Sequence, residues 1–119
     1  MKSHPIHRLD DDVHQRVRLG ILAELTNVAR ADFAHLKSTL ELTDGNLGRH
    51  LQVLQQAGLI TLDKRLEDGR PRTWVKVTRK GRAALRREMQ ALNDLITEIQ
   101  RHDHAPGMAR ARNKPAPET

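Results

Sequence analysis

Residues 32–60 read DFAHLKSTLELTDGNLGRHLQVLQQAGLI, and this pattern predicts two short helices joined by a tight turn at Glu41-Leu42. Asp32 and Thr43 are favourable N-caps, because a short side-chain oxygen accepts a hydrogen bond from a free backbone N–H of the first turn. Gly58 is expected as the C′ residue that ends the second helix. Apolar residues recur at helical spacing in both helices, namely Phe33, Leu36 and Leu40, then Leu47, Leu51 and Leu54.

A β-hairpin is predicted directly after these two helices. Apolar and polar residues alternate in the runs 60–66 and 73–78, as expected for strands with one buried face. The polar segment Glu67-Asp68-Gly69-Arg70-Pro71 lies between the two runs, and its glycine and proline are typical of a turn. We therefore expect a polar hairpin tip over residues 67–71.

Two further helices are predicted at the ends of the domain. The first spans residues 10–27, with an apolar stripe and three aspartates that suit the positive end of the helix dipole. The last begins after the cap Thr78 and runs to about His102. The expected fold class is mainly α with a small β-hairpin (α+β). Residues 1–9 are expected to be flexible, residues 10–102 to form one domain, and residues 103–119 to form a disordered basic tail.

The charge of the chain indicates a polyanionic partner. Net charge is +6 and the pI is about 10.5. Residues 59–82 hold eight basic and three acidic side chains, a net charge of +5 in one short segment. Phe33 and Trp74 are the only Phe, Trp or Tyr residues, too few for the stacking platform that single-stranded nucleic acid needs. Duplex DNA is therefore the expected polyanion, although a basic charge alone also fits a merely soluble protein.

Several classes of function are disfavoured by what the sequence lacks. Without cysteine the chain has no disulfide framework, zinc finger or thiolate redox switch. It has no phosphate-cradling glycine loop and no nucleophile motif, so we do not expect an enzyme or a cofactor. The first residues lack the apolar run of a signal peptide and no stretch is apolar enough for a membrane helix. A cytoplasmic location is expected.

The helix expected over residues 43–57 has a polar face that suits the major groove of duplex DNA. Asn, Gln and Arg pair with base edges, and two glycines keep the helix slim although each costs about 1 kcal/mol relative to alanine. Basic residues around the hairpin tip are expected to contact phosphates or the minor groove. A solvated helix face and a solvated charged hairpin fit the same pattern. The candidate DNA contacts are Lys37, Thr43, Asp44, Gly45, Asn46, Arg49, His50, Gln52, Lys64, Arg65, Arg70 and Arg72.

These residues resemble a prokaryotic family of winged-helix regulators, a compact relative of the MarR and ArsR groups. The resemblance covers about residues 9–95 and implies a homodimer that binds duplex DNA and regulates transcription, by analogy as a repressor. Gly48 stands where the family often has serine, so a hydroxyl contact is absent. The matching segments are 32–37, 42–47, His50-Leu51, Leu54, 57–60, 69–73, Thr78 and Gly81-Arg82.

A dimer is also predicted from apolar spacing in the terminal helices. The last helix carries a heptad seam of about two repeats, too short for a stable isolated coiled coil and therefore expected to pack against other helices. Packing within one chain remains the alternative. A twofold dimer would place two recognition helices about 34 Å apart, which predicts a palindromic or pseudo-palindromic operator. The candidate dimer contacts are Val13, Val17, Leu85, Met89, Leu92, Ile96 and Ile99.

Two alternative functions stay open at this point. The first is a winged-helix module that binds proteins without reading DNA. Such a module does not need a net charge of +5 concentrated at the hairpin. The second is a metal-gated or ligand-gated variant of the regulator, since His4, His7 and His14 lie near one terminus, and His102, Asp103 and His104 near the other. Neither histidine cluster has a compact helical ligand pair, so no metal residue is assigned.

Overall fold

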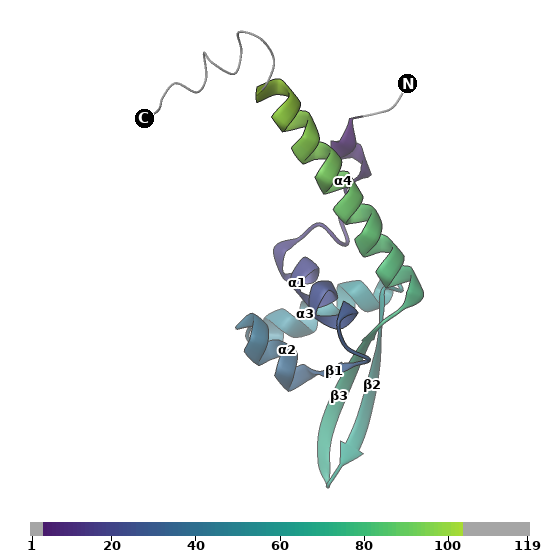
Figure 1. Cartoon of the computed structure of the whole chain (residues 1–119). Coiled ribbons are helices and arrows are strands. Elements are labelled where there is room, and N and C mark those ends of the chain that lie inside the picture. Colours follow the sequence, from purple (N-terminus) through teal and green to yellow (C-terminus); the bar gives the residue numbers. More distant parts are fainter. Residues whose placement is uncertain (1–3, 104–119) are drawn as a thin grey trace.

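The computed structural model describes residues 4–103, and its mainly helical α+β architecture confirms the predicted fold class (Figure 1). A short 3₁₀ helix is followed by a helical body, a three-stranded antiparallel sheet and one long helix. In chain order the elements are η1 (Pro5–Arg8), α1 (Arg16–Thr26), β1 (Ala31–Asp32), α2 (Phe33–Leu40), α3 (Asp44–Gln56), β2 (Ile60–Glu67), β3 (Arg70–Val77) and α4 (Arg79–Asp103).

Helices α2 and α3 begin and end where the sequence predicts. The Asp32 carboxylate accepts from the His35 backbone N–H at 2.8 Å, and the Thr43 hydroxyl accepts from that of Asn46 at 3.1 Å. Glu41 adopts a left-handed conformation with φ of 56° and makes the tight turn between the helices. Gly58 ends α3 with φ of +77°, a conformation that glycine adopts without steric cost.

The sheet has the order β1-β3-β2, and its hairpin turn is shorter than the sequence analysis predicted. Strands β2 and β3 stay paired up to Glu67 and Arg70, so the turn consists of Asp68 and Gly69 alone rather than residues 67–71. Both turn residues have positive φ, 53° and 74°, as a two-residue hairpin turn requires. Pro71 lies inside β3, at a point that β1 does not reach, and is tolerated there because it has β2 on one side only.

The first helix begins at Arg16 and not at Asp10, so that prediction is wrong. Asp10 starts a turn in which its carbonyl accepts from the N–H groups of Val13 and His14, while its carboxylate accepts from Asp12. Gln15 then caps α1 through its side-chain oxygen, which accepts from the Arg18 N–H at 3.0 Å. The aspartates therefore form a turn in front of the helix instead of its first turn.

Glu88 in α4 holds this N-terminal turn in place. Its side chain is buried, and Oε1 accepts from the Asp10 N–H at 2.9 Å while Oε2 lies 2.7 Å from His14 Nδ1. Arg8, at the end of η1, pairs with Asp94 farther along α4. Residues 5–8 form a 3₁₀ helix packed on α4, an element that the sequence did not predict.

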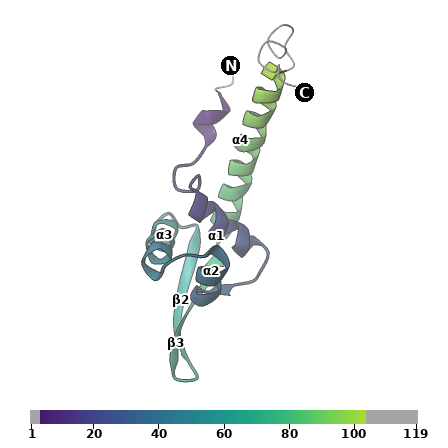
Figure 2. The same ribbon diagram turned by 90° about the vertical axis from the view of Figure 1, so that its left-hand side faces the viewer.

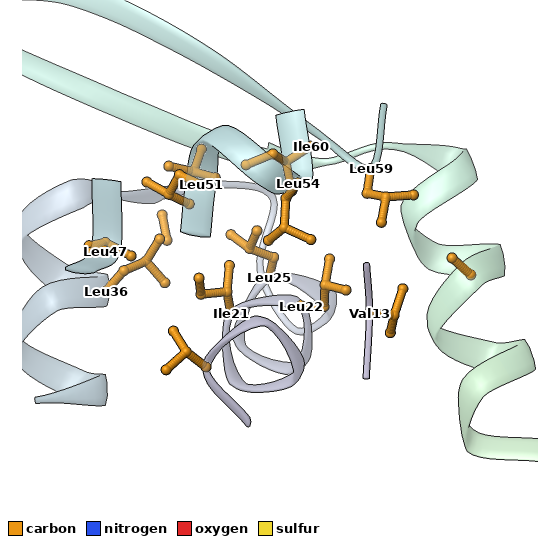
Figure 3. Close-up of a cluster of buried hydrophobic side chains, with 14 residues drawn as sticks. Val13, Ile21, Leu22, Leu25, Leu36, Leu47, Leu51, Leu54, Leu59 and Ile60 are labelled. Carbon is orange, nitrogen blue, oxygen red and sulfur yellow. The ribbon is translucent and has the colours of Figure 1, made fainter. Parts of the chain in front are cut away.

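One apolar core joins α1, α2, α3 and the base of the sheet (Figure 3). Val13 is fully buried in this core and Val17 almost so, which leaves Val13 no surface for a partner. The predicted dimer contact of Val13 is therefore corrected to a contact within the chain, whereas that of Val17 stays a prediction. Other buried members are Ile21, Leu22, Leu25, Leu36, Leu47, Leu51, Leu54, Leu59, Ile60 and Val75.

Helix α4 starts against this body and then extends beyond it. The Thr78 hydroxyl accepts from the Gly81 N–H at 2.9 Å, which confirms the predicted cap. Farther along, the seam residues Met89, Ile96 and Ile99 are 44%, 50% and 54% exposed, while Leu85 and Leu92 are half-buried. The hairpin and α4 project from opposite ends of the body (Figures 1 and 2). No helix within residues 4–103 is long and apolar enough to cross a membrane.

Candidate nucleic-acid interface

Helix α3 has a buried face, an exposed face and two flanks. Leu47, Leu51 and Leu54 hold it to the core. The opposite face presents exposed Gly45, Arg49 and Gln52 to solvent, as the sequence analysis expected. A Cβ placed on Gly45 would meet no atom of another element within 4 Å, so no other part of residues 4–103 covers this stretch of the helix. The exposed face is thus slim and bears side chains that can reach base edges.

Two of the predicted contacts neutralise each other. The Lys37 ammonium on α2 lies 2.9 Å from the Asp44 carboxylate at the start of α3. This ion pair bridges the two helices, and the negative charge of Asp44 also suits the helix N-terminus. Both side chains are exposed, so the pair adds little stability.

His50 lies on the flank of α3 that faces α1. Its Nδ1 is 3.1 Å from a guanidinium nitrogen of Arg18, whose other nitrogens donate to the carbonyls of Asp11 and Asp12. Partial burial, and then the positive charges of Arg18 and Arg49, lower the pKa of His50 below its ordinary value of 6.5. His50 is therefore neutral at pH 7 and is more enclosed than a freely exposed reading residue.

Acidification is expected to destabilise the fold through His50. Because its pKa is lower in the folded chain, the unfolded chain takes up the proton first as the pH falls below about 6.5. The contribution of His50 to the free energy of unfolding is thus greatest above about pH 6.5 and decreases as the pH falls from there to the lowered pKa. Urea unfolding at about pH 7.5 and about pH 5 tests this, and His50→Gln should lose less stability than wild type. Equal losses in both proteins would contradict the prediction.

The hairpin formed by β2 and β3, here called the wing, carries its basic residues on two different faces. Lys64 shares the face of Ile60 and Leu62, which looks toward α3, whereas Arg65 and Arg72 lie on the other face and are cross-strand neighbours. Arg65 pairs with Asp63 at 2.8 Å. Arg70 stands at the tip, directly after Gly69.

Arg72 belongs to a cluster around Trp74 that the sequence analysis did not find. The Arg72 guanidinium lies 3.7 Å from Asp32 and 3.5 Å from Glu67, and Glu67 also accepts from the Trp74 indole N–H at 2.9 Å. Arg30 stacks over the indole, 3.7 Å from the ring centroid, and Arg72 lies 5.5 Å from the same centroid. The cluster ties β1 to the wing, so it fixes the wing's direction. One feature of the sequence could have indicated the cluster: Trp74 lies on the opposite face of its strand from Val75 and Val77.

No group of three or more His, Cys, Asp or Glu side chains gathers at metal-binding distance within residues 4–103. The terminal histidine arrangement includes His104, which lies outside the described residues. Of the tail predicted over residues 103–119, Asp103 is the last residue of α4 and residues 104–119 lie outside the described residues.

A short helix-turn-helix followed directly by a basic hairpin defines the winged helix-turn-helix class. The chain belongs to the winged helix DNA-binding domain family, whose model matches residues 17–96. The resemblance to winged-helix regulators is thereby confirmed, with MarR-like transcriptional regulators as structural neighbours, and the family is one of DNA-binding regulators.

Individual relatives agree with this family. An uncharacterized protein of Methanocaldococcus jannaschii is 38% identical over 84 residues, which cover 71% of this chain and 91% of that protein. A transcriptional regulator homologue of Pyrococcus horikoshii has 34% sequence identity and a TM-score of 0.71, over 76% of this chain and 89% of that one. The transcriptional regulator BldR of Sulfolobus solfataricus shares the fold with 18% identity and a TM-score of 0.60, over 82% of this chain and 67% of that one.

Proposed function

We propose that this chain is a dimeric, sequence-specific regulator of transcription that acts as a repressor in the cytoplasm. In this proposal α3 enters the major groove of duplex DNA and the wing contacts phosphates or the adjacent minor groove. The observation that carries it is the slim exposed face of α3, with Gly45, Arg49 and Gln52, beside a wing of net positive charge. Base edges and phosphates are the two partners that these surfaces suit.

The base-reading contacts are assigned to the exposed face and N-terminal turn of α3. Arg49 and Gln52 have the side chains for base edges, and Asn46 is half-buried beside its cap. Thr43, Asp44 and Gly45 bring the helix N-terminus near the groove, and His50 lies at the edge of the reading face. Lys37 becomes a phosphate contact only if DNA displaces Asp44 from its ion pair.

The dimer is proposed to form through the seam on α4. Leu85, Met89 and Leu92 continue into Ile96 and Ile99. Leu85 packs partly against the core, whereas Met89, Ile96 and Ile99 are left exposed within residues 4–103. Pairing of two such seams buries apolar surface. Each Å² removed from water stabilises the dimer by about 25 cal/mol. A twofold axis through the seam would bring two copies of α3 to one side of the DNA, on the two half-sites of a pseudo-palindromic operator.

Selection from a random duplex library, followed by anisotropy titrations at several salt concentrations, tests the proposal. A regulator should enrich one sequence, and the logarithm of its affinity should fall linearly with the logarithm of salt concentration. A protein that binds only proteins would enrich no sequence. Absence of both enrichment and salt-dependent binding would refute the proposed function.

Arg70 and Arg72 should respond differently in the same titration. Arg70→Ala is expected to weaken binding to all sequences and to reduce the salt slope by about 1, because a phosphate contact releases one counterion. Arg72→Ala should change the slope less, since its guanidinium already lies between Asp32 and Glu67. A larger change in slope for Arg72→Ala than for Arg70→Ala would contradict this assignment of the wing.

A further inference from the structure

A crevice of about 360 Å³ separates α3 from the wing. Its floor is apolar and comes from three elements, with Phe33 at the start of α2, Leu51 on α3 and Leu62 on β2. Gln52 and Gln55 line the α3 side, and Lys64 with Thr73 line the wing side. Lys64 and Thr73 are cross-strand neighbours, so they stand together along one wall.

The walls of this crevice suit an anion. No Asp or Glu lines it, and all four polar side chains can donate hydrogen bonds. Within residues 4–103 the Lys64 ammonium has no ion-pair partner, whereas Arg65 and Arg72 on the other face of the wing both do. An apolar floor between donor-bearing walls matches a group with one charged side and one apolar side.

A sugar–phosphate unit of DNA has that chemistry and is brought there by the proposed docking. If α3 lies in the major groove and the wing tip in the neighbouring minor groove, the backbone that separates the two grooves must pass between them. We infer that the crevice holds one deoxyribose-phosphate unit in each half-site, an inference that rests on the proposed function. The phosphate contacts Lys64 and Thr73, and the deoxyribose packs on Phe33 and Leu62.

Gly48 keeps this crevice open from the α3 side. It is one of the lining residues, and a Cβ added to it would meet no atom within 4 Å. A larger side chain at this position would extend into the space of the backbone unit. This provides a variant that blocks the crevice without disturbing the core.

The test replaces single phosphates of the selected duplex by uncharged methylphosphonates, one position at a time. One replacement per half-site should weaken wild-type binding about tenfold, the effect of one hydrogen bond to a charged group. Lys64→Gln changes both half-sites of the proposed dimer, so it should weaken binding to the unmodified duplex by about the square of this factor. It should then lose nothing more on the modified duplex, because its contact with that phosphate is already absent. Lys76→Gln, an exposed lysine on the other face of β3, should keep the full sensitivity.

Gly48→Leu supplies the second arm. It should unfold at the same urea concentration as wild type or a higher one, yet bind the selected duplex about tenfold less tightly. Specific DNA binding that is unchanged in Gly48→Leu, or additive effects of Lys64→Gln and every methylphosphonate, would overturn this inference and leave the proposed function standing. The crevice would then be free for another occupant, such as a small anionic molecule. Absence of any duplex binding by wild type would refute both.

Discussion

Alanine at position 81 is expected to lower the free energy of unfolding by about 1–3 kcal/mol, the usual cost of overpacking. A Cβ on Gly81 would lie 2.1 Å from the Leu59 carbonyl oxygen and 2.8 Å from a Val77 methyl group. The carbonyl belongs to the backbone and accepts from the Thr78 N–H, so it cannot move away cheaply. The gain of about 1 kcal/mol that alanine normally brings to a helix does not offset this clash.

Gly48→Ala is the matched control for this prediction. It makes the same chemical change inside a helix, but its new methyl group meets nothing within 4 Å. The free energy of unfolding should therefore rise, by up to about 1 kcal/mol. Urea unfolding followed by circular dichroism at a constant m-value measures both variants. If Gly81→Ala is as stable as Gly48→Ala, the close packing of α4 on Leu59 is wrong.

Glutamate at position 96 is expected to dissociate the proposed dimer and to weaken operator binding by about 10²–10⁴-fold, the range that linked binding of two half-sites supplies. Ile96 lies in the middle of the exposed part of the seam and is half exposed, so the charge disturbs a partner and not the core. Light scattering should give the 13.5 kDa monomer, and anisotropy should give the affinity.

Thr97→Glu adds the same charge one residue away, at an exposed position off the seam. This control should remain a dimer and bind the operator as wild type does, apart from a small effect of charge. A dimeric Ile96→Glu protein, or a monomeric wild type that binds its operator with full affinity, would show that the seam does not form the interface.

The helix-turn-helix was predictable because its determinants are local. Asp32 and Thr43 act within three residues of themselves, and the apolar spacing of α3 alone defines its buried face. The start of α1 was not predictable, because the Asp10 N–H donates to the carboxylate of Glu88, which lies 78 positions later in the sequence. The hairpin turn had a local signal, the Asp68-Gly69 pair, which the nearby Pro71 obscured.

The site was predictable as a set of residue types and less so as a set of contacts. Nothing in local spacing shows that Asp44 neutralises Lys37, or that the register of β1 on β3 places acidic Asp32 near Arg72. The periodic stripe also does not tell whether Val13 faces the core or a partner, since both environments are apolar. Which basic side chains have an ion-pair partner, as Lys37, Arg65 and Arg72 do, therefore became visible only in the tertiary structure.

In the proposed complex two copies of α3 read one duplex while two wings hold its backbone. A hydroxyl-radical footprint on the duplex enriched by selection tests it most directly. We expect two protected patches related by twofold symmetry, about 34 Å or one helical turn apart, each flanked by backbone protection on the wing side. A single patch, or uniform protection along the duplex, would contradict it.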